Sequence, residues 1–411
     1  MPKIELLKKY AKLVVEVGAN VQKDQCLIVS APIDTAELTR LIVKAGYDAG
    51  AKEVHVQWGD SYISRMNYDG KSIETLTDIP QWKIDEAKYY KDKGACIISI
   101  TSPVPGINKG VDPLKMQQSG LAQMKAFKFV QDHMMANHTQ WCVIAAPNKV
   151  WAKKVFPDLN DDEAVEALWN AILKASRVRE ENDPVAEWAK HNLELLTHNK
   201  LLTSYQFDSL HFKNGLGTDL TIKLVKNHIW AGGGEVSTKG VDFNPNIPTE
   251  ENFTMPHKFG VNGKVVATKP LNYQGNLIED FWLEFKDGKV VNYDALKQKD
   301  TLKRLLEVDE GSVYLGEVAL LSYDSPINNT GILFLNTLFD ENASCHLALG
   351  RAYPMNVEGG TTMTPEELTK VGYNQSMVHS DFMFGSNDMH ITGTQVDGTK
   401  VTIFKDGNYV I

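Results

Sequence analysis

The sequence predicts an α/β domain with a parallel sheet, followed by an α+β domain that is rich in antiparallel strands. In the first half, short apolar runs alternate with stretches of helical periodicity, as expected of parallel strands that helices cover on both faces. In the second half, short alternating segments are joined by Asp-Gly pairs, which favour tight hairpins. A length of 411 residues is enough for two or more domains. We expect the first domain to span residues 1–195 and the second to span residues 196–411.

The first domain is expected to open with an amphipathic helix, because apolar residues recur at helical spacing in MPKIELLKKYAKLVVEVGA. Asp34 and Glu37 have the spacing of a capping box in front of the first connecting helix, and Gly50 is placed to end that helix. Two more helices should close the domain, one at residues 161–178 and one that begins at Pro184. Near-continuous apolar runs predict four buried strands, at residues 26–31, 53–58, 95–100 and 141–146.

The second domain is predicted to be a series of strands and hairpins with few helices, one of them at residues 300–307. Strand-like alternation marks the segments SYQFDSLHFKNG, TDLTIKL, DFWLEFKDGKVVNY and TKVTIFKDGNYVI. Asp-Gly turns are expected at residues 287–288, 397–398 and 406–407. The triplet Gly232-Gly233-Gly234 predicts a turn or a close approach of two backbones rather than a phosphate-binding loop.

Composition and missing motifs argue against several classes of protein. Lys and Arg total 43 against 52 Asp and Glu, and a net charge of −9 disfavours binding to nucleic acid or anionic lipid. No apolar stretch approaches the roughly 18 residues that span a bilayer, and the four cysteines are scattered. We therefore expect a soluble protein of the reducing cytoplasm. The motifs GxGxxG, GxxxxGKS/T, GxSxG and HExxH are absent, which disfavours nucleotide binding and the commonest hydrolase signatures.

Acidic and histidine residues of the second half stand in apolar or turn-rich surroundings where a solvated charge is not expected: Glu251, Glu317, His346, His379 and Asp381. Glu317 interrupts the run VYLGEVALL, where an isolated ionised carboxylate is costly unless it is paired or bound to a metal. His379 and Asp381 are two positions apart, so a strand would project both from one face. On the residues alone, a structural ion pair for Glu317 and a hydrogen-bonded core histidine for His346 stay open.

Taken together, three carboxylates and two imidazoles without a thiolate favour divalent ions such as Zn²⁺, Co²⁺, Mn²⁺ or Mg²⁺. Five ligands exceed what one tetrahedral ion needs. They suit a site for two cations per chain, in which one carboxylate bridges ions roughly 3.5 to 4 Å apart.

The motifs PTEENFTMPH, LGEVAL, NASCHLALGRAYP and HSDFM, in this order, resemble the metal-binding segments of the aminopeptidase T, aminopeptidase S and aminopeptidase II family of metallopeptidases. The resemblance extends from the N-terminal helix to the final hairpin. It implies that the five residues above bind two divalent cations, with Glu317 as the bridge and Glu251 rather than its neighbour Glu250 as the ligand. It also implies a homodimer.

The resemblance further implies roles around the metal ligands. Tyr353, in GRAYP, would hold the substrate carbonyl or the tetrahedral intermediate. Apart from the resemblance, we expect a carboxylate near the bridging water, Glu250 or Glu317, to carry the proton to the departing amine. His257 and Arg351 are weaker candidates. His257 would serve proton transfer or support a ligand, and Arg351 would contact an oxyanion or bond to a carboxylate ligand.

The expected function is hydrolysis of the first peptide bond of short peptides by water that two cations activate. The second domain would be catalytic, and the first would shape substrate access or a subunit contact. Two alternatives remain at this stage. One is a dinuclear amidohydrolase or phosphoesterase, which uses the same ligand types, and the other is a non-enzymatic small-molecule binding protein whose buried carboxylates are ion-paired.

Overall fold

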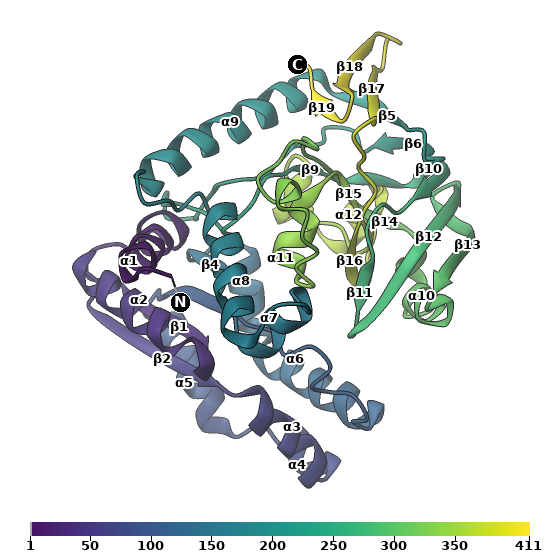
Figure 1. The fold of residues 1–411 in the computed structure, drawn as a ribbon. Coiled ribbons are helices and arrows are strands. Elements are labelled where there is room, and N and C mark those ends of the chain that lie inside the picture. The colour runs from purple at the N-terminus through teal and green to yellow at the C-terminus, as the bar shows by residue number, and fades with distance from the viewer. Residues whose placement is uncertain (1) are drawn as a thin grey trace. The chain divides into compact units, whose positions relative to one another are not determined.

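The computed structural model describes residues 2–411, and the chain forms two compact units (Figure 1). The first unit runs to Lys190 and also takes in Gly234–Pro248. The second unit consists of His191–Gly233 and Thr249–Ile411. The chain first passes from one unit to the other within a single long helix, α9 (Pro184–Tyr205).

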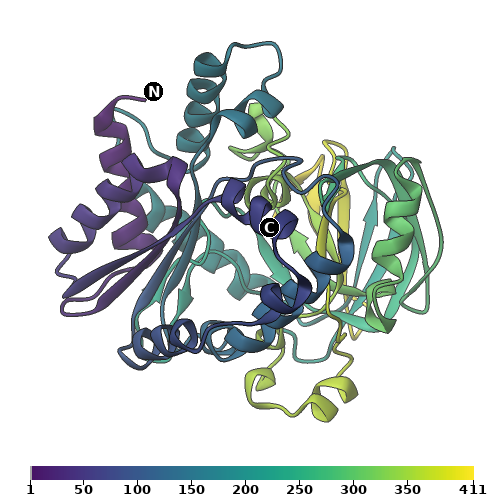
Figure 2. The ribbon, with the colours of Figure 1, turned by 90° about the horizontal axis from the view of Figure 1, so that it is seen from below.

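A four-stranded parallel sheet in the order β2-β1-β3-β4 forms the centre of the first unit, as predicted. Its strands are β1 (Cys26–Pro32), β2 (Glu53–Gly59), β3 (Cys96–Thr101) and β4 (Trp141–Ala145). Helices pack on both faces, since Gly46 of α2 lies against Leu27 on one face and Tyr90 of α5 packs with Ile28 on the other (Figure 2). The prediction of full burial is wrong for the edge strand β2, all of whose side chains are at least partly exposed, and for β3, whose side chains are buried only at alternate positions.

The helices of the first unit largely follow the predicted pattern: α1 (Ile4–Leu13), α2 (Ala36–Asp48), α3 (Ser61–Gly70), α4 (Ile73–Thr77), α5 (Gln81–Asp92), α6 (Pro113–Met135), α7 (Lys149–Val155) and α8 (Asp161–Ala175). A π-helical turn, Val14–Gly18, continues α1. The capping box at Asp34 and Glu37 is wrong. A 3-10 turn at Ile33–Thr35 moves the start of α2 to Ala36, and the hydroxyl of Thr35 donates to Pro32 O at 2.7 Å instead.

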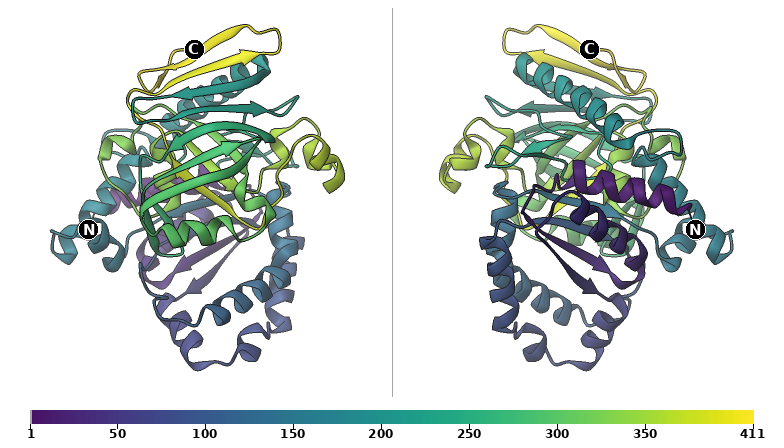
Figure 3. Two further views of the ribbon diagram at one scale, coloured as in Figure 1. Left: turned by 90° about the vertical axis from the view of Figure 1, so that its right-hand side faces the viewer. Right: turned by 90° about the vertical axis from the view of Figure 1, so that its left-hand side faces the viewer.

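Two antiparallel sheets build the second unit. The larger has nine strands in the order β11-β12-β10-β6-β5-β17-β18-β19, with β13 beside β12, and its strands can be followed in Figure 3. The Asp-Gly hairpins are confirmed: Asp287-Gly288 joins β12 to β13 and Asp406-Gly407 joins β18 to β19, each with both residues at positive φ. The strands are β5 (Phe207–Lys213), β6 (Asp219–Leu224), β10 (Pro256–Val266), β11 (Leu271–Tyr273), β12 (Asn276–Lys286), β13 (Lys289–Lys297), β17 (His390–Gln395), β18 (Lys400–Lys405) and β19 (Asn408–Tyr409).

The smaller sheet of this unit has the order β16-β15-β14-β9. Its strands are β9 (Asn252–Thr254), β14 (Leu315–Leu320), β15 (His346–Gly350) and β16 (His379–Met383). One of its faces packs against the larger sheet, where Val318, Leu347 and Phe382 share a core with Phe212 and Phe281. Side chains alternate between the two faces of a strand, so the neighbours of these core residues point the other way. Short helices complete the unit: α10 (Lys299–Leu306), α11 (Thr337–Asp340) and α12 (Pro365–Lys370).

Candidate metal centre

The face of the smaller sheet that points away from the core brings the predicted ligands together. Pairing places Glu317 of β14 opposite Ala348 of β15, and Ala348 opposite Asp381 of β16. His346 precedes Ala348 by two positions, and His379 precedes Asp381 by two, so each imidazole points from the same face as its neighbour. The small side chain of Ala348 lies between the two carboxylates and leaves room between them.

A β-bulge at Gly316 turns Glu317 toward this face. The pairing register shifts between Leu315 and Glu317, so Leu315 faces the core although it is only two positions away. A Cβ atom on Gly316 would lie 2.3 Å from Arg351 O, so only glycine permits this approach of the two backbones. The local sequence LGEV therefore places a carboxylate where strict alternation would have placed it in the core.

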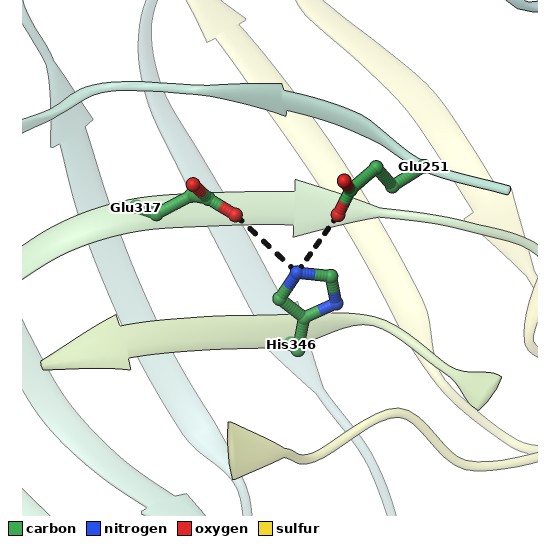
Figure 4. A group of neighbouring side chains, drawn as sticks. All are labelled: Glu251, Glu317 and His346. Atoms are coloured by element: carbon green, nitrogen blue, oxygen red, sulfur yellow. Dashed lines mark ion pairs between the residues drawn. The ribbon is translucent and has the colours of Figure 1, made fainter. Parts of the chain in front are cut away.

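Glu251, Glu317 and His346 form the first set of candidate ligands. His346 Nε2 lies 3.0 Å from Glu251 Oε2 and 3.3 Å from Glu317 Oε1, so both carboxylates point at one ring nitrogen (Figure 4). The three potential ligand atoms lie within 4.8 Å of one another, and all three residues are buried.

Glu317, His379 and Asp381 form the second set, again within 4.8 Å. His379 Nε2 lies 3.3 Å from Asp381 Oδ1 and 3.7 Å from Glu317 Oε2. The two oxygens of Glu317 thus face different histidines, Oε1 toward His346 and Oε2 toward His379. This is the arrangement that a carboxylate needs if it is to bridge two cations.

The chemistry of these groups fits divalent cations. Within residues 2–411, Glu251 Oε2 and Asp381 Oδ1 are buried yet have no hydrogen-bond partner, although each is close to a ring nitrogen. His379 Nδ1–H donates to Arg351 O at 2.7 Å, which leaves the lone pair of Nε2 directed at the carboxylates. Buried acceptors without donors are costly, and either a proton on each facing imidazole or a cation shared by the carboxylate oxygens and the imidazole lone pairs would satisfy them.

In the absence of a cation, the buried carboxylates favour protonation of the two imidazoles. Burial alone would lower the pKa of His379, but Asp381 and Glu317 raise it to about 10. For His346, burial is likewise outweighed by Glu251 and Glu317, which raise its pKa well above the ordinary value. The metal-free site therefore holds protons on its imidazoles, and a cation must displace them when it binds.

Glu341, to which no motif of the sequence pointed, adds a carboxyl group that interacts electrostatically with both sets. It lies in the 3-10 turn Glu341–Ala343, and burial together with the Asp381 and Glu251 carboxylates raises its pKa well above the ordinary value. Burial also raises the pKa of Glu317. The signal was present in ENASCH, where an acidic residue stands five positions before His346. Because a 3-10 turn does not continue the two-residue period of a strand, the spacing between Glu341 and His346 does not predict that both face the same site.

Of the other predicted residues, Tyr353 lies beside a candidate ligand, while Glu250 and His257 belong to neither set. The ring of Tyr353 packs 4.8 Å from that of His379, and its pKa is raised well above the ordinary value by burial and by nearby carboxylates.

Glu250 belongs to neither set among the described residues, and its Oε2 lies 3.7 Å from His191 Nε2. Arg351 contributes its backbone carbonyl to His379, while the residue itself is exposed. His257 accepts at Nδ1 from Phe259 N and is likewise in neither set.

A sheet face that carries carboxylates and imidazoles around one shared glutamate has the donor set of a protein that binds divalent metal ions. Comparison with known proteins specifies it. Residues 3–409 match the model of the thermophilic metalloproteases, M29, and the chain belongs to that family.

Relatives match over nearly the whole chain. Aminopeptidase AmpS of Bacillus subtilis is 46% identical over 98% of this chain and 98% of its own length, and aminopeptidase 2 of Geobacillus stearothermophilus is 44% identical over 98% and 97%. The structure of wild-type AmpT from Thermus thermophilus superposes with a TM-score of 0.93 at 37% identity, covering 99% of this chain and 100% of the other. The predicted family and fold class are confirmed.

Proposed function

We propose that this metal-dependent aminopeptidase removes the first residue from short peptides with two divalent cations per chain. The ligands are Glu251, Glu317, His346, His379 and Asp381, and Glu341 adds a carboxyl group to the same site. The observation that carries the proposal is the position of Glu317, whose two oxygens face two different imidazoles. A single cation would need only one of these two sets.

Bound divalent cations supply Lewis acidity, which lowers the pKa of water from 15.7 to about 7 and polarises a carbonyl group. The phenol of Tyr353 donates a hydrogen bond to the carbonyl oxygen of the substrate, and its raised pKa keeps it protonated at neutral pH. Glu250 or Glu317 carries the proton to the departing amine. The free amine of the substrate binds a cation or a nearby carboxylate, which confines cleavage to the N-terminus.

The ligand types favour Zn²⁺, Co²⁺, Mn²⁺ or Mg²⁺. We assign catalysis to residues 196–411, and substrate access and a subunit contact to residues 1–195. A homodimer is supported by large apolar side chains that are exposed on α3, α5 and α6, among them Met66, Trp82 and Met124. A cytoplasmic location is supported by the four cysteines, which are all free. None of the helices in residues 2–411 is both long and apolar enough to cross a bilayer.

The test is metal analysis combined with a substrate panel. Protein stripped with a strong chelator should lose hydrolysis of an amino-acid anilide and regain it when Co²⁺, Zn²⁺ or Mn²⁺ is added, with two equivalents bound per chain. An N-acetylated anilide and a phosphate ester serve as controls and should not be cleaved. Turnover that survives the chelator, or cleavage of the acetylated substrate at a similar rate, would contradict the proposal.

A further inference from the structure

The segment that carries Glu251 is anchored by a buried chain of side-chain hydrogen bonds. The next residue, Asn252, is fully buried. Its Nδ2 donates to Leu195 O at 3.0 Å and to Asn199 Oδ1 at 2.7 Å, both on α9. Its Oδ1 accepts from the hydroxyl of Tyr409 at 3.0 Å. Both amide hydrogens and the carbonyl oxygen of Asn252 are therefore used, and the side chain has one fixed orientation.

The same chain fixes Glu251 from its other side. Asn199 Nδ2 donates to Gly232 O at 2.9 Å. The backbone of Gly232 then packs directly on that of Glu251, because a Cβ atom on Gly232 would lie 2.0 Å from Glu251 O. Two backbone bonds between Ala231 and Phe253, at 2.8 and 2.9 Å, lock the adjacent residues. The predicted close backbone approach at the glycine triplet is thus confirmed, and it occurs at a candidate ligand.

Tyr409 connects this anchor to the strand of Glu317. Its hydroxyl also lies 3.2 Å from Leu320 O on β14, and Leu320 is the residue that pairs with Asn252 across the sheet. The hydroxyl of this partly buried tyrosine therefore contacts both the strand that follows Glu251 and the strand that carries Glu317. Its ring is held independently of the hydroxyl, by stacking on His198 at 4.4 Å and by Phe404 at 4.3 Å.

We infer that Tyr409, Asn252 and Asn199 are positioning residues that hold Glu251 at the distance from His346 which a cation requires. The hairpin at the C-terminal end of the chain thereby sets the cation affinity of the first set of ligands through Glu251, which belongs to that set alone, whereas the second set shares only Glu317 with it. This inference rests on the proposed function, because it assumes that the site takes up cations. Residues that orient metal ligands typically contribute 10- to 100-fold to metal affinity.

The experiment is a titration of metal-free, full-length protein with Co²⁺. Calorimetry measures the binding affinities, and the visible absorption of the bound ion reports its surroundings. Tyr409→Phe removes one oxygen atom and keeps the stacked ring. In this variant we expect one of the two binding steps to weaken 10- to 100-fold and its absorption band to change, while the other step stays as in the unaltered protein.

The matched control is Tyr10→Phe, because the hydroxyl of Tyr10 also lies near a backbone carbonyl, Ala145 O, to which it donates at 3.2 Å in the other unit. This variant should bind both cations as the unaltered protein does, and the thermal unfolding of the two metal-free variants should be similar. Asn199→Ala removes the hydrogen bonds of Asn199 to Asn252 and Gly232, and it should weaken the same binding step as Tyr409→Phe.

The outcomes separate the two proposals. If the unaltered protein takes up no cation, the proposed function falls and this inference falls with it. If it binds two cations and Tyr409→Phe binds both with unchanged affinity and spectrum, only the inference is refuted. Equal weakening of both steps in Tyr409→Phe would also refute it, since a general loss of structure acts on both sets.

Discussion

Replacing Glu317 by Gln tests the central feature of the site. The amide has nearly the shape of the carboxylate, but it lacks the charge and has one oxygen in place of two, so it cannot serve both sets of ligands. Glu317 faces two imidazoles and lies in a β-strand whose residues are all buried. The strand packing should survive, because the hydrophobic neighbours on the opposite face are unchanged.

The size of the effect follows from the two interactions that are lost. Each charge-assisted interaction is worth about 1.5 to 3 kcal/mol, so the loss of two lowers transition-state stabilisation by about 3 to 6 kcal/mol. At about 1.4 kcal/mol for each factor of ten, kcat/KM should fall roughly 10²- to 10⁴-fold. Hydrolysis of an amino-acid anilide measures this, and metal analysis should show fewer than two cations per chain.

Glu358→Gln is the control, because the exposed Glu358 is in neither set of ligands and the variant makes the same chemical change. It should retain full activity. Near-normal turnover with two bound cations in Glu317→Gln would refute the bridging role, whatever the control shows.

Three further predictions concern the same site. In metal-free protein, nearby carboxylates raise the pKa of His379 from an ordinary 6.5 to about 10. The protonated imidazole therefore contributes fully to stability below pH 6.5, and this contribution is lost as the pH rises toward 10. Thermal unfolding at a series of pH values should show the decline, and a flat profile would contradict it. Tyr353→Phe should lower kcat about 10²- to 10³-fold with little change in bound metal, whereas unchanged kcat would exclude the phenol from catalysis. Ala348→Leu should fill the space between Glu317 and Asp381 and reduce cation uptake by calorimetry, while Ala348→Ser, which is small and polar, should retain it.

The main features of the fold could be predicted because apolar runs form buried strands and Asp-Gly pairs form tight turns. Runs such as ACIISI and the Asp-Gly turns depend on local chemistry, and both appear where expected. The cap of α2 failed for a reason outside the local pattern. Asp34 lies inside a 3-10 turn, so its side chain is not at the start of the helix. The exposure of β2 also depends on strand order, which local periodicity does not contain.

The candidate site also has features that the sequence predicts and features that only the folded chain reveals. Glu317 stood out because an acid in an apolar run needs compensation, and the structure supplies two imidazoles for it. Its direction depends on the bulge at Gly316, which arises from backbone packing against Arg351 O and has no signature in hydrophobic alternation. Glu341 lies in an irregular turn, where no period marks which way a side chain points. The choice of Glu251 over Glu250 came from the resemblance, because the sequence alone does not give the direction of either side chain.

The candidate ligands come from distant parts of the sequence, since Glu251 and Asp381 are separated by 130 positions. Pairing of β14, β15 and β16 brings these parts together in the folded second unit. An unfolded chain therefore has only isolated acidic and imidazole side chains, and it offers a cation no cluster of ligands.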